Sequence, residues 1–389
     1  MTASAAAAEI AIRRGGPETA GGGRFRPAAG HELLLQIVGD RGDEARAALE
    51  AWCGTFDPRL PVDGGTYRLL PMIFHRMREW NVDHELRPLL KGVYRRSLVA
   101  NSRLVDGAAP ALQALTDQGL APVLLKGAAL VADGYYPTLA TRPMADIDVY
   151  VTREDHGAAV AVLEGFGWRS PLPAARHAVT FESPGGVATI DLHLHAIGAV
   201  MTQSSDLTLT AGIRQASGLD LAASVPDPTA QLLITLIHGA DPNPEPTVRW
   251  VADALLVLTA RDGITVDWNR VVDYARAQQV GLLLVRMLEV LGAFAGGDVP
   301  PPVIESLRSL PTWPLERWER RMMDSDHSSL AKRITQSTVR ASADQRSAST
   351  PALLTGLLRR YHDTWQVPWT LVPVVAISKF LQHVTDRRV

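Results

Sequence analysis

The sequence predicts an α+β fold in which a small mixed β-sheet, with helices on one side, is flanked by two helical regions. Apolar residues repeat at helical spacing over residues 31–119, and the same spacing returns from residue 227. Between them, residues 120–226 contain short apolar or alternating runs separated by glycine- and proline-containing turns, which is typical of strands. The length of 389 residues also favours more than one folding unit.

We therefore expect four segments along the chain. Residues 1–30, which are mostly alanine, glycine and arginine, are expected to form a disordered tail. Residues 31–119 form the first helical region and residues 120–226 the mixed core. Residues 227–389 form a helical bundle, with a mobile linker near residues 324–350 and closing helices at 353–361 and 371–384.

Composition excludes several classes of partner. The 39 lysines and arginines nearly balance the 41 aspartates and glutamates, so no overall basic field attracts a long nucleic acid or an anionic membrane. Cys53 is the only cysteine, which rules out an internal disulfide and fits a reducing cytoplasm. The apolar stretch at 367–377 is about half the length of a membrane span. We therefore expect a cytoplasmic protein without a membrane span.

Two aspartates two positions apart, Asp146 and Asp148, occupy an expected strand with the sequence DIDVYV. Side chains alternate faces along a strand, so both carboxylates point to one side while Ile147 packs on the other. Mg²⁺ is bound in proteins through one or two carboxylates, waters and substrate phosphates. The pair therefore favours phosphoryl or nucleotidyl transfer over a closed structural metal site.

A candidate anion-binding turn lies upstream of this strand. The apolar run Val123–Leu125 predicts a buried strand, and Lys126 and Gly127 then open a helix that Gly134 ends. A glycine at such a turn lets backbone N–H groups approach an anion, which the helix dipole also favours. Lys126 adds a positive charge. Arg142, just before the acidic strand, is a second candidate, with a surface salt bridge as the alternative.

A second acidic strand is expected over residues 187–194, where polar and apolar residues alternate. Asp191, His193 and His195 would then share one face. Asp191 is the candidate third carboxylate of the site. His193 could contact a metal, act as a general base or orient an acceptor. For both histidines the alternative is a structural hydrogen bond.

Taken together, the motifs LLKGAAL, RPMADIDVYV and IDLHLH resemble the DNA polymerase beta-like nucleotidyltransferase superfamily. The residues of these motifs are most similar to one branch of the superfamily, an uncharacterised bacterial nucleotidyltransferase family. The resemblance implies two Mg²⁺ ions held by Asp146, Asp148 and Asp191. It also implies a nucleoside triphosphate bound through Lys126, Gly127 and Arg142. The superfamily's Gly-Ser turn is glycine and alanine here, so phosphate contacts fall to backbone N–H groups, Lys126 or Arg142.

The same branch has a helix start like the one at Arg249, Trp250 and Asp253, which would line the nucleotide cleft. The alternative places Trp250 in the core and makes Asp253 a surface or capping residue.

The resemblance implies a Mg²⁺-dependent enzyme that moves a nucleotidyl group from a nucleoside triphosphate, such as ATP, to a hydroxyl. The acceptor would be a small molecule, peptide or protein. Asp146, Asp148, Asp191 and His193 would be catalytic. Three alternatives stay open: a kinase using the same metal site, an inactive nucleotide-binding or scaffold protein, and a helical interaction protein with an incidental acidic strand.

Overall fold

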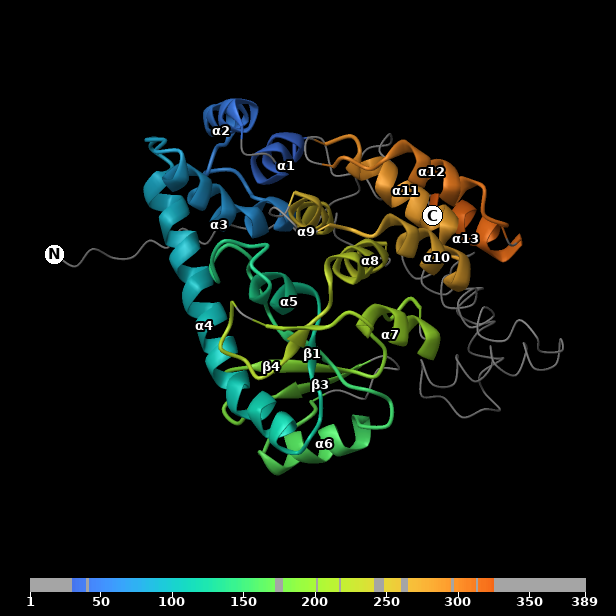
Figure 1. Ribbon diagram of the computed structural model, residues 1–389. Helices are drawn as coiled ribbons and strands as arrows, with labels where there is room; N and C mark the ends of the chain where they lie inside the picture. Colours follow the sequence, from blue (N-terminus) through green and yellow to red (C-terminus); the bar gives the residue numbers. More distant parts are fainter. Residues whose placement is uncertain are drawn as a thin grey trace, which may run out of the picture.

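The computed structural model describes residues 30–39, 42–171, 178–200, 202–216, 218–240, 248–259, 265–294, 297–312 and 314–324. A sheet lies in the lower half of this part of the chain in the view of Figure 1, with helices above it, beside it and beneath it. The expected tail before residue 30, the linker beyond residue 324 and the closing helices lie outside the described residues.

The sheet is mixed and has six strands in the order β3-β4-β2-β1-β6-β5. The strands are β1 (Val123–Leu124), β2 (Ile147–Tyr150), β3 (Ala178–Glu182), β4 (Thr189–His193), β5 (Arg214–Gln215) and β6 (Ser224–Val225). Strands β2 and β4 are parallel neighbours, whereas β3 and β4 form an antiparallel hairpin. The expected mixed sheet is therefore confirmed, and its central pair brings the two acidic strands together.

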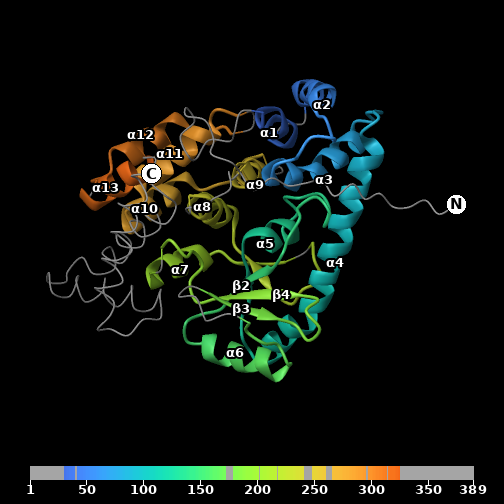
Figure 2. The same cartoon turned by 180° about the vertical axis from the view of Figure 1, so that it is seen from behind.

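Helices cover both faces of the sheet, which corrects the expectation of helices on one side. Helix α6 (His156–Gly165) lies beneath the sheet, whereas α5 (Lys126–Ala132) and α8 (Pro228–Gly239) lie above it (Figures 1 and 2). The aliphatic residues of β2 and β4 are buried in one cluster with Leu163 of α6 and Leu112 of α4 (Arg87–Asp117). Because side chains alternate, the polar residues of both strands face the other side.

The N-terminal helical region consists of α1 (Glu32–Gly39), α2 (Asp43–Thr55), α3 (Gly64–Glu79) and α4 (Arg87–Asp117). Asp63 caps α3 by accepting a hydrogen bond from the backbone N–H of Thr66 at 2.9 Å. Helix α4 runs for 31 residues through Pro110 and extends down the side of the sheet (Figure 2). It therefore connects the N-terminal helices to the level of the acidic strands.

After the sheet, the chain returns to helices. They are α9 (Val248–Leu258), α10 (Trp268–Gln278), α11 (Gly281–Leu291), α12 (Pro301–Arg308) and α13 (Pro314–Asp324). The apolar residues that repeat at helical spacing from residue 227 include those of α8 to α11. A short helix, α7 (Gln203–Thr210), and the two-residue strands β5 and β6 were not expected. Their sequences lack a clear apolar period.

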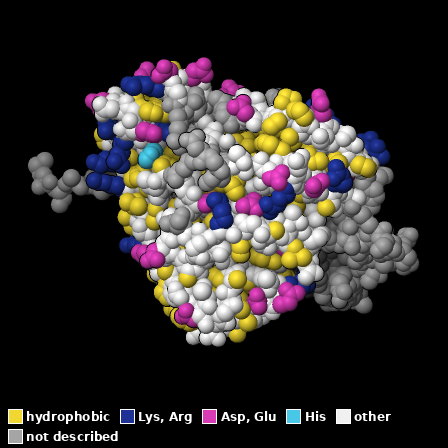
Figure 3. Space-filling model, in the orientation of Figure 1, with side chains coloured by type: hydrophobic (Ala, Val, Ile, Leu, Met, Phe, Trp, Pro, Cys, Tyr) yellow, Lys and Arg dark blue, Asp and Glu magenta, His cyan; other side chains and the backbone are white. Residues whose placement is uncertain are grey.

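The surface carries charges of both signs. Figure 3 shows them scattered over one face, with lysine and arginine side chains gathered near the start of α4. In that region Arg78, Lys91 and Arg95 are exposed. Among the described residues, no helix combines the length and the apolarity that crossing a membrane requires.

Candidate functional site

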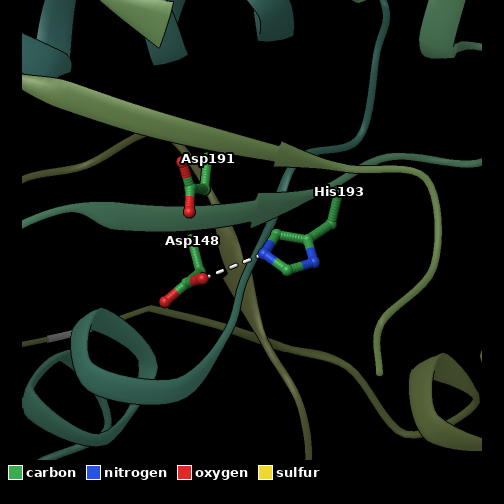
Figure 4. A group of neighbouring side chains, drawn as sticks. All are labelled: Asp148, Asp191 and His193. Atoms are coloured by element: carbon green, nitrogen blue, oxygen red, sulfur yellow. Dashed lines mark hydrogen bonds and ion pairs between the residues drawn. The ribbon is translucent and has the colours of Figure 1, made fainter. Parts of the chain in front are cut away.

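The centre of the candidate site is a pair of carboxylates on neighbouring strands. Parallel pairing of β2 with β4 places Asp148 directly beside Asp191. Both side chains point to the same side of the sheet, and the ring of His193 is directed toward Asp148 (Figure 4). The hydroxyl of Thr180, on β3, donates a hydrogen bond to Oδ1 of Asp191 at 2.7 Å. The hairpin therefore fixes one carboxylate while the central strands set the spacing of the pair.

Asp148 is buried among positive and polar partners. Its Oδ1 lies 2.5 Å from Nζ of Lys126 and 2.9 Å from Nε2 of His193. Burial alone would raise the pKa of Asp148, but the Lys126 charge and the His193 hydrogen bond outweigh it and hold this pKa well below its usual range. Asp148 is therefore an anion in a largely dry environment, where it attracts cations strongly.

His193 has a defined orientation. Its Nδ1 lies 3.1 Å from the backbone carbonyl oxygen of His195. A carbonyl oxygen can only accept a hydrogen bond, so we assign the ring hydrogen to Nδ1. Nε2 is then the atom that faces Asp148.

The expectation that His195 shares the face of His193 is wrong. Strand β4 ends at His193, and the chain then bends away. Nδ1 of His195 lies 2.8 Å from Oδ2 of Asp206 on α7, and its Nε2 lies 3.1 Å from Arg153. Asp206 also accepts a hydrogen bond from the backbone N–H of Ala196 at 2.8 Å. This contact holds the backbone that follows β4, and sequence reasoning did not find Asp206.

Asp146 lies one residue before β2 and is partly buried. Burial raises its pKa, and the nearby charges of Asp148 and Asp191 raise it further. Within the described residues, the group whose potential ligand atoms all lie within 4.8 Å of one another consists of Asp148, Asp191 and His193. The structure thus brings three of the expected site residues together, with Asp146 near them but outside that group. Two carboxylates and an imidazole suit a divalent ion.

The turn between β1 and α5 has unusual backbone geometry. Lys126 adopts a left-handed conformation with φ of 48°, which side chains rarely favour. A Cβ atom at Gly127 would lie 1.9 Å from Nη1 of Arg142. Glycine at this position is therefore required by the close approach of an arginine. The expected contact of its backbone N–H groups with an anion stays a prediction.

Arg142 forms a buried ion pair with Asp253 of α9. Its Nε and Nη2 donate to the two carboxylate oxygens at 2.9 Å and 2.8 Å, and the Tyr136 hydroxyl donates to Oδ1 at 2.6 Å. Both charged residues are only 6% exposed. The alternatives of a surface salt bridge for Arg142 and a surface or capping role for Asp253 are therefore wrong. Trp250 is buried, as its core alternative required.

Arg249 adds a further positive charge at this place. It makes no hydrogen bond or ion pair with the described residues, and burial together with repulsion by Arg142 lowers its pKa. Its charge acts in turn on Asp146, whose pKa it lowers in part. Positive charge from α9 therefore reaches the acidic strand.

Helix α4 fixes the loop that carries Arg142. Buried Asn101 donates hydrogen bonds to the backbone oxygens of Leu139 and Arg142, at 2.6 Å and 2.8 Å. It also accepts one from the N–H of Met144 at 3.0 Å. Ser97 donates to the oxygen of Ala140 at 2.7 Å. Sequence reasoning missed both residues, because single polar residues inside a long helix give no signal of what they contact.

Comparison with known proteins gives one family. A family model described as an uncharacterised nucleotidyltransferase matches residues 66–296, a range that includes every residue of the site described above. No match is found among curated proteins or among solved structures. The matched range covers more than half of the 389 residues. The chain therefore belongs to this uncharacterised nucleotidyltransferase family.

Proposed function

We propose that this protein is a metal-dependent nucleotidyltransferase that moves a nucleoside monophosphate group from a nucleoside triphosphate to a hydroxyl. The observation that carries the proposal is the side-by-side placement of Asp148 and Asp191 on β2 and β4, next to Lys126 at the start of α5. The acceptor is a small molecule, a peptide or a protein. Family membership supports the class of reaction.

The acidic residues of the site would bind metal, and the basic residues would bind the triphosphate. Asp146, Asp148 and Asp191 would hold two Mg²⁺ ions, which would stabilise charge on the triphosphate and lower the pKa of the acceptor hydroxyl. Lys126 and the N–H groups around Gly127 neutralise the departing pyrophosphate. Asp253 occupies Nε and Nη2 of Arg142, so Nη1 beside Gly127 is the donor through which Arg142 would assist.

The proposed step is a single displacement at the α-phosphorus. The acceptor oxygen forms a bond to that phosphorus while the bond to the bridging oxygen of the β-phosphate breaks. Pyrophosphate leaves with the bonding electrons. The acceptor proton passes to Asp191, which Thr180 orients.

The test follows the α-phosphate of the nucleotide. We expect label from α-³²P-labelled triphosphates to appear on a co-purified acceptor, with release of pyrophosphate. Each of MgATP, MgGTP, MgCTP and MgUTP is also tested for thermal stabilisation. Asp148→Asn should lose the transfer. The matched control is Asp83→Asn, which removes a carboxylate whose side chain is 96% exposed.

Three results would contradict the proposal. Transfer of γ-label with release of the nucleoside diphosphate would make the protein a kinase. Binding of nucleotide without any transfer to any acceptor would favour an inactive nucleotide-binding protein, for which the missing serine at the Gly127 turn is the supporting observation. No stabilisation by any nucleotide would favour a helical interaction protein.

A further inference from the structure

We propose that His193 is itself a metal ligand, and that Asp148, Asp191 and Nε2 of His193 form a site that prefers Mn²⁺ over Mg²⁺. The inference deepens the proposed function, on which its catalytic meaning rests, because it assigns a ligand and a metal preference to the ion shared by the two strands. Its own test is metal binding without nucleotide.

The distance between the His193 ring and the Asp148 carboxylate fits two ligands of one ion. Nε2 of His193 and Oδ1 of Asp148 are 2.9 Å apart. Donors next to each other on an octahedral ion, with bonds of about 2.1 Å, are separated by about 3 Å. One carboxylate oxygen each of Asp148 and Asp191 and one ring nitrogen of His193 all lie within 4.8 Å of one another. The Asp148 and His193 atoms therefore have the spacing of adjacent ligands, and Asp191 is the third member of the same close group.

The ring hydrogen of His193 is assigned to Nδ1, away from Asp148. Since Nδ1 donates to the carbonyl of His195, neutral His193 presents a lone pair at Nε2 to the carboxylate of Asp148. In this form Nε2 and Oδ1 can both donate electron pairs to one cation, and a metal ion there replaces the proton of the hydrogen bond between them. His193 and Asp148 are 1% and 6% exposed, so water screens the attraction of a cation to these two side chains poorly.

Hydrogen bonds from neighbouring residues orient the proposed ligands. Metal-bound histidines commonly donate their second ring nitrogen to a carbonyl or carboxylate, which fixes the ring. Here the carbonyl belongs to His195, whose ring and following N–H are both held by Asp206. Thr180 performs the same task for Asp191. Lys126 donates a hydrogen bond to Asp148, so each of the three ligands is oriented by a neighbouring residue.

The donor set decides the metal. Carboxylates alone suit Mg²⁺, Ca²⁺ and Mn²⁺, whereas imidazole suits transition metals and binds Mg²⁺ poorly. One imidazole with two carboxylates therefore shifts the preference toward Mn²⁺. Asp146, outside this group of three, remains available for the Mg²⁺ that accompanies the triphosphate.

The experiment uses Mn²⁺ as a magnetic probe of the full chain in the absence of nucleotide. Electron spin echo modulation detects nitrogen bound to Mn²⁺, so the wild-type complex should show ¹⁴N modulation that changes to ¹⁵N after labelling of histidine alone. Titration followed by the signal of free Mn²⁺ gives the affinity. His193→Gln should weaken Mn²⁺ binding at least 10-fold and Mg²⁺ binding less, and Asp206→Asn should weaken Mn²⁺ binding roughly 10-fold.

The control is His84→Gln, which removes a partly exposed histidine three residues before α4 and should leave Mn²⁺ affinity unchanged. The labelling result needs no variant to fold. Bound Mn²⁺ without histidine nitrogen modulation would overturn the proposal, as would an unchanged affinity in a folded His193→Gln protein. Either result would leave nucleotidyl transfer intact if α-label is still transferred, so the two proposals fail separately.

Discussion

Arg142 and Asp253 are joined by two hydrogen bonds, at 2.9 Å and 2.8 Å, although 111 residues separate them in the sequence. The arginine lies on the loop that leads into β2, and the aspartate lies on α9. Both are buried, so neither charge can be satisfied by water instead. The pair therefore fixes the distance between the acidic strand and the helices that follow the sheet.

The first prediction is a large cost for breaking this pair on one side. Asp253→Ala should destabilise the protein by about 3–5 kcal/mol, because it leaves a buried guanidinium without its counter-charge. Arg142→Met combined with Asp253→Ala should cost less than the sum of the two single changes. Urea denaturation of all four proteins measures the coupling. Additive losses would show that the two charges do not depend on each other.

The second prediction concerns acid. Burial alone would raise the pKa of Asp253, but the charge and hydrogen bonds of Arg142 outweigh it and lower this pKa below its usual value. An aspartate whose pKa is lowered by folding stabilises the folded protein at pH values above its pKa in the unfolded chain, which is about 3.9. This stabilisation is lost as the pH falls through the pKa of the folded protein. The stability gap between wild type and Asp253→Asn should therefore narrow from pH 5 toward pH 2. A difference in the free energy of unfolding that stays constant from pH 5 to pH 2 would contradict the ion pair.

The third prediction tests the close approach at Gly127. Gly127→Ala places a methyl group where Nη1 of Arg142 lies, and Arg142 cannot retreat without breaking its pair with Asp253. We expect a loss of about 1–3 kcal/mol in thermal or urea unfolding. Gly92→Ala is the matched control, because nothing lies within 4 Å of its added atom and α4 should gain up to about 1 kcal/mol. Equal effects at both glycines would refute the argument.

The fourth prediction separates metal binding from nucleotide binding at Lys126. Lys126→Met removes the ammonium that sits on Asp148, so Mn²⁺ binding without nucleotide should become tighter. If Lys126 also contacts the triphosphate, KM for the metal–nucleotide complex should rise roughly 10- to 100-fold, the value of one charged hydrogen bond. Metal titration and steady-state kinetics measure the two effects. If Mn²⁺ binding becomes tighter and KM does not rise, Lys126 contacts Asp148 but not the triphosphate.

Part of this architecture follows from the sequence. Alternation along the two acidic strands is a local pattern, and it predicted the face on which Asp148 and Asp191 lie. That Asp146 shares this face stays a prediction. The mixed sheet and the helical regions were also predictable, because long apolar stripes define them. That Asp148 and Asp191 are direct neighbours depends on strand order, which no local pattern contains.

The remaining features depend on contacts between distant segments. Asp253 is the one acidic residue on an otherwise apolar stripe of α9, and its partner lies on a loop with no sequence signature. Asn101 likewise gives no sign of the three backbone contacts that it makes. His195 was misplaced because alternation holds only while a strand continues, and β4 stops two residues earlier.

The buried charge of Arg142 also limits how this protein could be divided or recombined. Any version ending near residue 226 would retain the arginine and lose its counter-ion, so the sheet should not be obtainable as an independent module. An evolutionary exchange of the downstream helices would succeed only if the incoming segment carried its own carboxylate to the same place.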